Sequence, residues 1–218
     1  MPSPPATIAL PRTLFLYALL YGGMVCMAGV LGVKQVALGP LAVEGGIFAF
    51  LMLVAIGSAV AELYGRATAD WLVRLGFVPL IVSALLIQIV LALPTDAGMY
   101  PPAVSAFPIV VGQGARMMLA GLISYGTSQT LNVLVFARLS RPAAGGGTRL
   151  LWLRGMIASA VSQVIDTLLF ITISFLGERP ILALMAGQML TKVVLSIVLV
   201  PWLITGLVAL GRKLDRGV

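Results

Sequence analysis

Apolar segments of bilayer-spanning length alternate with short polar segments along the whole chain. A transmembrane helix needs roughly 20 predominantly apolar residues to cross the hydrocarbon core of a bilayer. We predict six such helices, at about residues 14–33, 45–63, 73–94, 109–136, 152–176 and 181–210. The last segment is longer than the bilayer requires, so we expect it to tilt, to break near Pro201 or to emerge into water. The predicted fold class is an all-α integral membrane protein, with residues 1–218 forming one transmembrane domain.

The fifth segment carries polar residues near its middle, where they are most costly. A carboxylate at bilayer depth costs roughly 2.5–3.5 kcal/mol on insertion scales. Such a group is retained where it faces a cavity, a partner or a substrate. Ser159, Ser162, Gln163 and Asp166 follow the spacing i, i+3, i+4 and i+7, which places them on one face of a helix. We therefore expect this face to point into the protein and the opposite face to contact lipid or other helices.

The fourth segment repeats this spacing. Its polar residues are Tyr125, Ser128, Gln129 and Asn132. Both polar faces lie at similar distances from the loop between the two segments, so they can wall a common cavity. The alternative is simple hydrogen bonding between helices, which is worth about 0.6 kcal/mol per contact. We favour this alternative for the serines, and a binding site for Gln129, Asn132, Gln163 and Asp166 taken together.

The sixth segment contributes Lys192 at the depth of Asp166. From the turn near residue 178, Asp166 lies about 12 residues back and Lys192 about 14 residues forward, so the two can meet across the helical hairpin. A buried pair of this kind can be purely structural, because each charge offsets the desolvation of the other. It can equally be a switch that breaks and re-forms during transport. The sequence leaves both interpretations open.

Two further charged residues are candidates near the ends of the segments. Glu62 closes the second segment, where it is either part of a site or a solvated carboxylate near Arg66. Arg116 lies in the outer part of the fourth segment, about 180° around the helix from Tyr125. We expect it to extend outward to the interface or to pair with Glu44 or Asp96, and we favour a substrate contact less.

Lys and Arg residues predict the orientation, because cytoplasmic loops are enriched in them. With both termini in the cytoplasm, ten of these residues fall in cytoplasmic segments and two in external loops. The ten are Arg12, Arg66, Arg74, Arg138, Arg141, Arg149, Arg154, Arg212, Lys213 and Arg216, and the two are Lys34 and Arg179. Three spans followed by three also give two halves of opposite orientation, which is compatible with a 3+3 inverted repeat.

Composition narrows the class further. The chain is 60 % hydrophobic and only 10 % charged, whereas soluble domains carry about a quarter charged residues. The net charge of +7 resides mainly in the short loops, so topology explains it better than nucleic-acid binding does. The sequence has no histidine, one cysteine and no phosphate-binding loop. We therefore expect no metal, no cofactor and no enzymatic activity.

Several motifs carry a family resemblance. They are AR at 115–116, SQTLNVLVFARL at 128–139, LR at 153–154, SQVIDTLLF at 162–170 and GQ at 187–188, with a weaker match in ELYGRATA at 62–69. These segments resemble the queuosine precursor transporter family, also described as the putative vitamin uptake transporter family. The sequence departs from the family pattern at Leu51, Ser58 and Asn132, where Pro, Asp and Asp are common.

The resemblance implies six transmembrane helices and uptake of 7-deazaguanine precursors of queuosine, in the cyano and aminomethyl forms, across the bacterial inner membrane. A guanine-like edge presents N–H donors that a carboxylate can accept and a carbonyl that an amide can satisfy. The candidate substrate-binding residues are Asp166, Gln163, Gln129, Asn132, Tyr125, Lys192, Glu62 and Arg116. The expected partners are thus a small deazapurine substrate and the lipid bilayer, and a homodimer is compatible with the sequence.

Three functional hypotheses follow. The first is a permease that moves a deazapurine base by alternating access around the cavity of the fourth to sixth spans. The second is the substrate-binding subunit of an energy-coupling vitamin or nucleobase transporter, which works only with a separate ATPase. The third is an intramembrane enzyme, which the absence of histidine and of a nucleophile–base pair disfavours.

Overall fold

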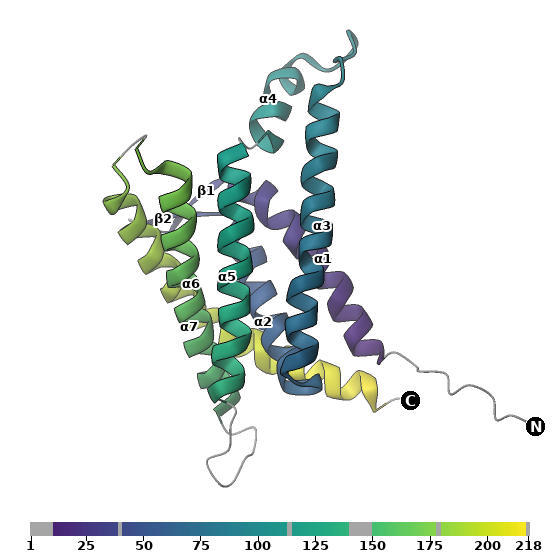
Figure 1. Cartoon of the computed structure of the whole chain (residues 1–218), viewed down its shortest axis with the longest axis vertical. Helices are drawn as coiled ribbons and strands as arrows, with labels where there is room; N and C mark the ends of the chain where they lie inside the picture. Colours follow the sequence, from purple (N-terminus) through teal and green to yellow (C-terminus); the bar gives the residue numbers. More distant parts are fainter. Residues whose placement is uncertain (1–10, 39–40, 113–114, 140–149, 178–179, 217–218) are drawn as a thin grey trace, which may run out of the picture.

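A bundle of long helices makes up the protein (Figure 1). The computed structural model describes residues 11–38, 41–112, 115–139, 150–177 and 180–216. Its elements are α1 (Arg12–Gly32), β1 (Gln35–Leu38), β2 (Leu41–Glu44), α2 (Gly46–Tyr64), α3 (Arg66–Ala92), α4 (Pro101–Val111), α5 (Ala115–Leu139), α6 (Leu151–Phe175) and α7 (Leu182–Asp215). The predicted loop charges Arg141, Arg149 and Arg179 lie outside the described residues.

Five of these helices are long and apolar enough to cross a membrane, and the number is six if α4 and α5 form one bent span. Helices suit this environment because every backbone N–H and C=O within the bilayer must find a partner inside the protein. The chain is therefore a multi-pass membrane protein. The predicted segments agree with α1, α2, α6 and α7 to within a few residues at most of their ends.

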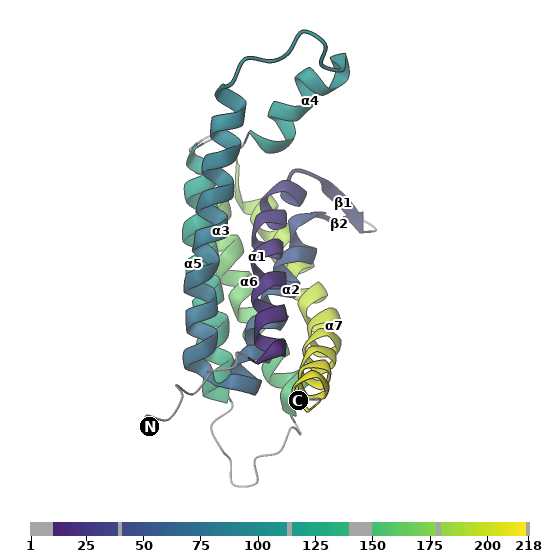
Figure 2. The ribbon, with the colours of Figure 1, turned by 90° about the vertical axis from the view of Figure 1, so that its right-hand side faces the viewer.

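The third and fourth segments differ from the prediction. The third helix begins at Arg66 rather than near residue 73, because Gly65, with φ of 85°, reverses the chain directly after α2. The fourth segment is a pair of helices, α4 and α5, bent by 46° relative to one another. Residues 112–116 read GQGAR, and a span drawn on hydropathy averaged over about 20 residues passes over this short interruption. Figure 2 shows α4 beside the end of α3, above the rest of the bundle.

The first connection also departs from an all-helical fold. Residues 35–38 and 41–44 pair as an antiparallel hairpin in which Gln35 lies opposite Glu44. The strand β2 leads directly into α2 and packs against α7. The hairpin consequently fixes the position of Glu44 next to the beginning of α7.

The last helix runs unbroken through Pro201, so of the three expected alternatives the break at this residue does not occur. Proline is tolerated in transmembrane helices because neighbouring groups satisfy the freed backbone atoms. Beyond Pro201 the helix continues below α2 toward the beginning of α1 (Figure 1). There the hydroxyl of Thr13 donates to the carbonyl of Gly211, and the backbone N–H of Thr13 donates to Asp215. The two ends of the described chain therefore lie side by side.

Burial divides the helices into central and peripheral ones. The helix α2 packs against α1, α3, α5 and α7, and most of its side chains are buried. In contrast, α3 exposes a long apolar face that includes Leu75, Val82, Leu86 and Ile89. A face of this kind is suited to lipid. The helices α5, α6 and α7 pack against one another in succession, and the polar residues lie between them.

Candidate functional site

A cluster of polar side chains is buried between α5, α6 and α7. Its members are Ser124, Ser128, Gln129, Asn132, Ser159, Ser162, Gln163, Asp166, Thr167, Thr191, Lys192 and Ser196. The i, i+3, i+4, i+7 spacing on α5 and α6 turns both polar faces inward, as the sequence predicted. We call these residues the polar core.

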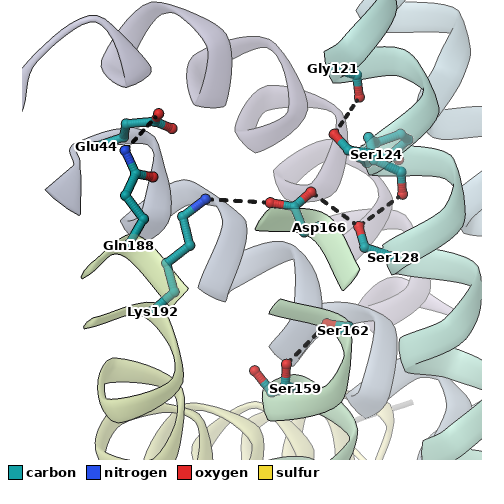
Figure 3. A network of polar contacts seen from close by, with 10 residues as sticks. Glu44, Gly121, Ser124, Ser128, Ser159, Ser162, Asp166, Gln188 and Lys192 are labelled. Carbon is teal, nitrogen blue, oxygen red and sulfur yellow. Dashed lines mark hydrogen bonds and ion pairs between the residues drawn. The ribbon is translucent and has the colours of Figure 1, made fainter. Parts of the chain in front are cut away.

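Asp166 and Lys192 form an ion pair within the polar core (Figure 3). The Lys192 Nζ atom lies 3.5 Å from Oδ2 of Asp166, and the two residues are only 4 % and 7 % exposed. The hydroxyl of Ser128 donates to the other carboxylate oxygen at 3.4 Å. The predicted meeting of Asp166 and Lys192 across the α6–α7 hairpin is confirmed.

A second polar contact lies one helical turn before Lys192. The amide of Gln188 donates to the Glu44 carboxylate at 3.1 Å, which joins α7 to β2. Gln188 is buried, whereas Glu44 is half-buried. Figure 3 shows Gln188 and Lys192 on the same side of α7, with Asp166 beyond Lys192. Polar side chains thus extend from the hairpin to the centre of the polar core.

Two tyrosines connect the polar core to α1 and α3. The hydroxyl of Tyr125 lies 3.1 Å from that of Tyr21 and 3.3 Å from the carbonyl of Val73. The Tyr21 hydroxyl in turn lies 3.5 Å from the Oε1 atom of Gln129. A Cβ atom at Gly76 would lie 2.2 Å from the Tyr125 hydroxyl, so only glycine at position 76 permits this arrangement. Tyr125 therefore contacts α1 and α3 and reaches Gln129 through Tyr21.

Asn132 faces α2. Its Nδ2 atom donates to the carbonyl of Val54 and to the hydroxyl of Ser58, both at 3.2 Å. Because a carbonyl only accepts hydrogen bonds, the contact with Val54 fixes the orientation of the amide. The Oδ1 atom has no hydrogen-bond partner within the part of the chain that the structure describes. Asn132 consequently offers one free acceptor.

Gln163 is the most incompletely satisfied side chain of the polar core. It is fully buried, and neither its Nε2 nor its Oε1 atom has a hydrogen-bond partner among the described residues. The Nε2 atom of Gln129 and the hydroxyls of Ser159 and Ser196 are likewise without a partner there. A buried polar group that lacks a hydrogen bond costs about 1–3 kcal/mol. Free donors and acceptors at this depth suit a polar ligand.

Glu62 lies outside the polar core, and of its two interpretations the solvated carboxylate near Arg66 is wrong. Its carboxylate pairs with Arg154 of α6, and Arg212 of α7 lies 3.9 Å away. Arg66 instead pairs with Asp70 at 3.2 Å. Along α6, Arg154 precedes Asp166 by 12 residues, which corresponds to about 18 Å. Hydropathy could not show that the end of α2 faces the beginning of α6.

Arg116 is exposed, in agreement with the expectation that it extends outward, and it contacts the end of α6. Its guanidinium donates to the backbone carbonyls of Ile173 and Leu176 at 2.5 and 2.7 Å. These carbonyls belong to the end of α6, where a helix has no backbone donors of its own for them. Because Ile173 lies seven residues beyond Asp166, roughly 10 Å along the helix, Arg116 is separate from the polar core.

Sequence reasoning missed Tyr21 as a neighbour of the polar core. The signal was present, because Thr13, Tyr17, Tyr21 and Val25 recur every four residues on α1 and are all buried. Because tyrosine also occurs in ordinary apolar spans, the sequence alone does not distinguish this buried face of α1 from the rest of the segment. Among the described residues no group of three His, Cys, Asp or Glu side chains is arranged to hold a metal ion.

A pocket of about 310 Å³ between the end of α3 and α4 lies apart from these residues. It is lined by Val90, Leu91, Leu93, Pro94, Thr95, Asp96, Met99, Val104, Phe107 and Pro108. Most of these side chains are apolar, and its position at the end of α3 separates it from Asp166. It therefore contributes nothing to the polar core.

Buried, incompletely paired polar groups between membrane-spanning helices are typical of proteins that pass a substrate or ion through the membrane. Residues 44–206 match the family described as "Putative vitamin uptake transporter", and the chain belongs to this family. Family membership confirms the resemblance seen in the sequence, and this is a family of transporters rather than of enzymes.

A relative from Bacillus subtilis (strain 168) is named "Probable queuosine precursor transporter". It is 34 % identical over 149 residues, which are 65 % of this chain and 61 % of the relative. The match therefore spans less than two thirds of the relative's length. Comparison with solved structures gave no match.

Proposed function

We propose that the protein imports 7-deazaguanine precursors of queuosine, in the 7-cyano and 7-aminomethyl forms, across the bacterial inner membrane. The substrate binds in a cavity that opens between α5, α6 and α7 during transport. The name of the Bacillus subtilis relative and the family of the chain both support this choice of substrate.

The observation that carries the proposal is the set of buried amides that lack partners. Gln163 offers one donor group and one acceptor, Asn132 offers an acceptor, and Gln129 offers a donor. A guanine-like base presents a ring carbonyl and adjacent N–H groups, so it matches such a mixture. Asp166 accepts one of the N–H groups through an oxygen of its carboxyl group.

This assignment leaves Glu62 and Arg116 without substrate contacts. Both bind other helices near the ends of the bundle. Their proposed role is to hold α2, α5, α6 and α7 together while the polar core changes its accessibility. Tyr125 acts on the substrate only through Tyr21 and Gln129.

Uptake of radiolabelled 7-cyano-7-deazaguanine into liposomes that contain only this purified chain tests the proposal. We expect saturable uptake that unlabelled 7-aminomethyl-7-deazaguanine inhibits and that protein-free liposomes lack. Uptake that requires an added ATPase module would instead support a substrate-binding subunit of an energy-coupling transporter. The absence of both binding and uptake would contradict the proposed substrate.

A further inference from the structure

The ion pair between Asp166 and Lys192 differs from a pair that only stabilises the fold. Buried charges stabilise a protein only when their geometry is favourable and additional hydrogen bonds satisfy both partners. Here the Lys192–Asp166 contact is 3.5 Å, and the Ser128 contact to the same carboxylate is 3.4 Å. Both distances lie at the long end of the hydrogen-bonding range. The pair is therefore weakly held and can separate.

Lys192 has little else to hold it in place. An ammonium group carries three N–H donors, and within the described structure its contact with Asp166 is the hydrogen bond that Lys192 makes. One turn away on each side of Lys192, the Oε1 atom of Gln188 and the hydroxyl of Ser196 are buried without partners. Lys192 can therefore move along α7 to other acceptors when it leaves Asp166.

A second carboxylate lies on the hairpin side of the pair. Glu44 is half-buried and contacts Gln188, which precedes Lys192 by one turn of α7. Other titratable or charged groups that face α6 include Tyr125 of α5, which contacts Tyr21, and Arg116 of α5, which contacts the end of α6. Glu62 of α2 pairs with Arg154 near the beginning of α6. The polar core as defined above thus contains one carboxylate, that of Asp166. The Gln188–Glu44 contact extends the polar side chains from there toward the hairpin.

We propose that the Asp166–Lys192 pair carries the proton that couples substrate uptake to a proton gradient. This inference rests on the proposed function. A proton binds Oδ2 of Asp166, an O–H bond forms and the contact with Lys192 breaks. The base then enters between the two side chains: the neutral acid accepts a ring N–H, and Lys192 donates to the ring carbonyl.

Release follows the same steps in reverse. On the other side of the membrane Asp166 loses its proton to water, and the restored carboxylate attracts Lys192. Closure of the ion pair expels the base and lets the empty protein return with no net charge on the pair. One proton therefore moves in the same direction as each molecule of base.

Liposomes with an imposed pH gradient test the coupling. The membrane potential is held at zero with potassium and valinomycin, the exterior is about one pH unit more acidic, and 7-cyano-7-deazaguanine is the probe. One proton per substrate allows accumulation up to about tenfold, because each pH unit corresponds to a factor of ten. We expect the concentration of the base inside the liposomes to exceed that outside, and the interior to acidify when substrate is added. A protonophore should abolish both effects.

The double variant Asp166→Asn with Lys192→Gln removes the pair without leaving an unpaired charge. We expect it to bind the base with an affinity independent of pH and to equilibrate the base without accumulating it. In the unmodified protein, binding should tighten as the pH falls. The matched control is Arg66→Gln with Asp70→Asn, which removes an ion pair from α3 outside the polar core and should leave accumulation unchanged.

The outcomes separate the two proposals. Uptake that only equilibrates in the unmodified protein, without interior acidification, would overturn the coupling and leave the transport function intact. Accumulation by the double variant would also overturn it, as would pH-independent binding by the unmodified protein. Failure of the unmodified protein to bind or move the base would overturn the proposed function itself.

Discussion

Asp166 and Lys192 bring opposite charges together where an isolated charge of either sign is strongly disfavoured. Removing one partner of a buried pair costs about 3–5 kcal/mol, because the remaining charge is left uncompensated. We therefore expect Asp166→Asn and Lys192→Gln together to destabilise the protein less than the sum of the single effects, by at least about 1 kcal/mol. Unfolding of the four purified proteins in detergent gives this interaction energy. Additivity within about 0.5 kcal/mol would contradict the pairing.

Gln163 is expected to serve binding rather than stability. In the protein without ligand its amide is buried and has no partner within the described structure. The leucine side chain is similar in volume to glutamine and has no polar atoms to leave unpaired. Gln163→Leu should therefore leave the free energy of unfolding unchanged or raise it. It should weaken deazaguanine binding by about 1–3 kcal/mol, or roughly 5- to 150-fold, because ligand groups lose their partners. Calorimetric titration and thermal unfolding measure the two effects.

Ser174→Ala is the control for this substitution. Ser174 lies near the end of the same helix, is buried, and its hydroxyl has no hydrogen-bond partner among the described residues. Its replacement should leave binding unchanged. Equal binding by the Gln163→Leu variant and the unmodified protein would remove Gln163 from the site.

The polar residues illustrate what a sequence reveals at this scale. Helical spacing and depth predicted that Asp166 and Lys192 meet, because both follow from counting along adjacent helices. The partners of Glu62 and Arg116 were missed, because they depend on how helices rotate and which ends adjoin. The contacts of the candidate residues with a substrate remain a prediction.

Among the helices, Glu62 joins three that are distant in sequence. Its carboxylate on α2 pairs with Arg154 of α6 and lies near Arg212 of α7. Glu62→Gln removes the negative charge that the two neighbouring arginines face, so we expect a loss of about 1–3 kcal/mol of stability. Asp70→Asn is the control, because exposed pairs contribute only about 0–1 kcal/mol. Equal stability of the two variants in thermal unfolding would show that the Glu62 contact does not hold the helices together.

The presence of the helices was predictable, but some of their boundaries were not. Hydropathy located the apolar spans, yet Arg66 and Asp70 conceal the first turns of α3, although they form an i, i+4 pair. The break between α4 and α5 is hidden for the opposite reason, since residues 112–116 (GQGAR) are a short interruption between two apolar stretches. The β1–β2 hairpin depends on packing against α7, which no local pattern records.

For the whole molecule, the position of the chain ends constrains the topology. Thr13 and Asp215 are in contact, so the ends of the described chain lie on the same side, as an even number of spans requires. The distribution of Lys and Arg predicts that this side is the cytoplasm. A green fluorescent protein fused to the C-terminus should therefore fluoresce, and alkaline phosphatase fused there should be inactive. The reverse result would contradict the predicted orientation.

Direct binding tests the central claim that the polar core receives a guanine-like base. Purified protein is titrated with 7-cyano-7-deazaguanine, 7-aminomethyl-7-deazaguanine, adenine and a panel of small vitamins. We expect saturable binding of the deazaguanines, with adenine at least about tenfold weaker because its edge lacks the carbonyl and adjacent N–H. Binding of a vitamin, with no response to either deazaguanine, would contradict the account.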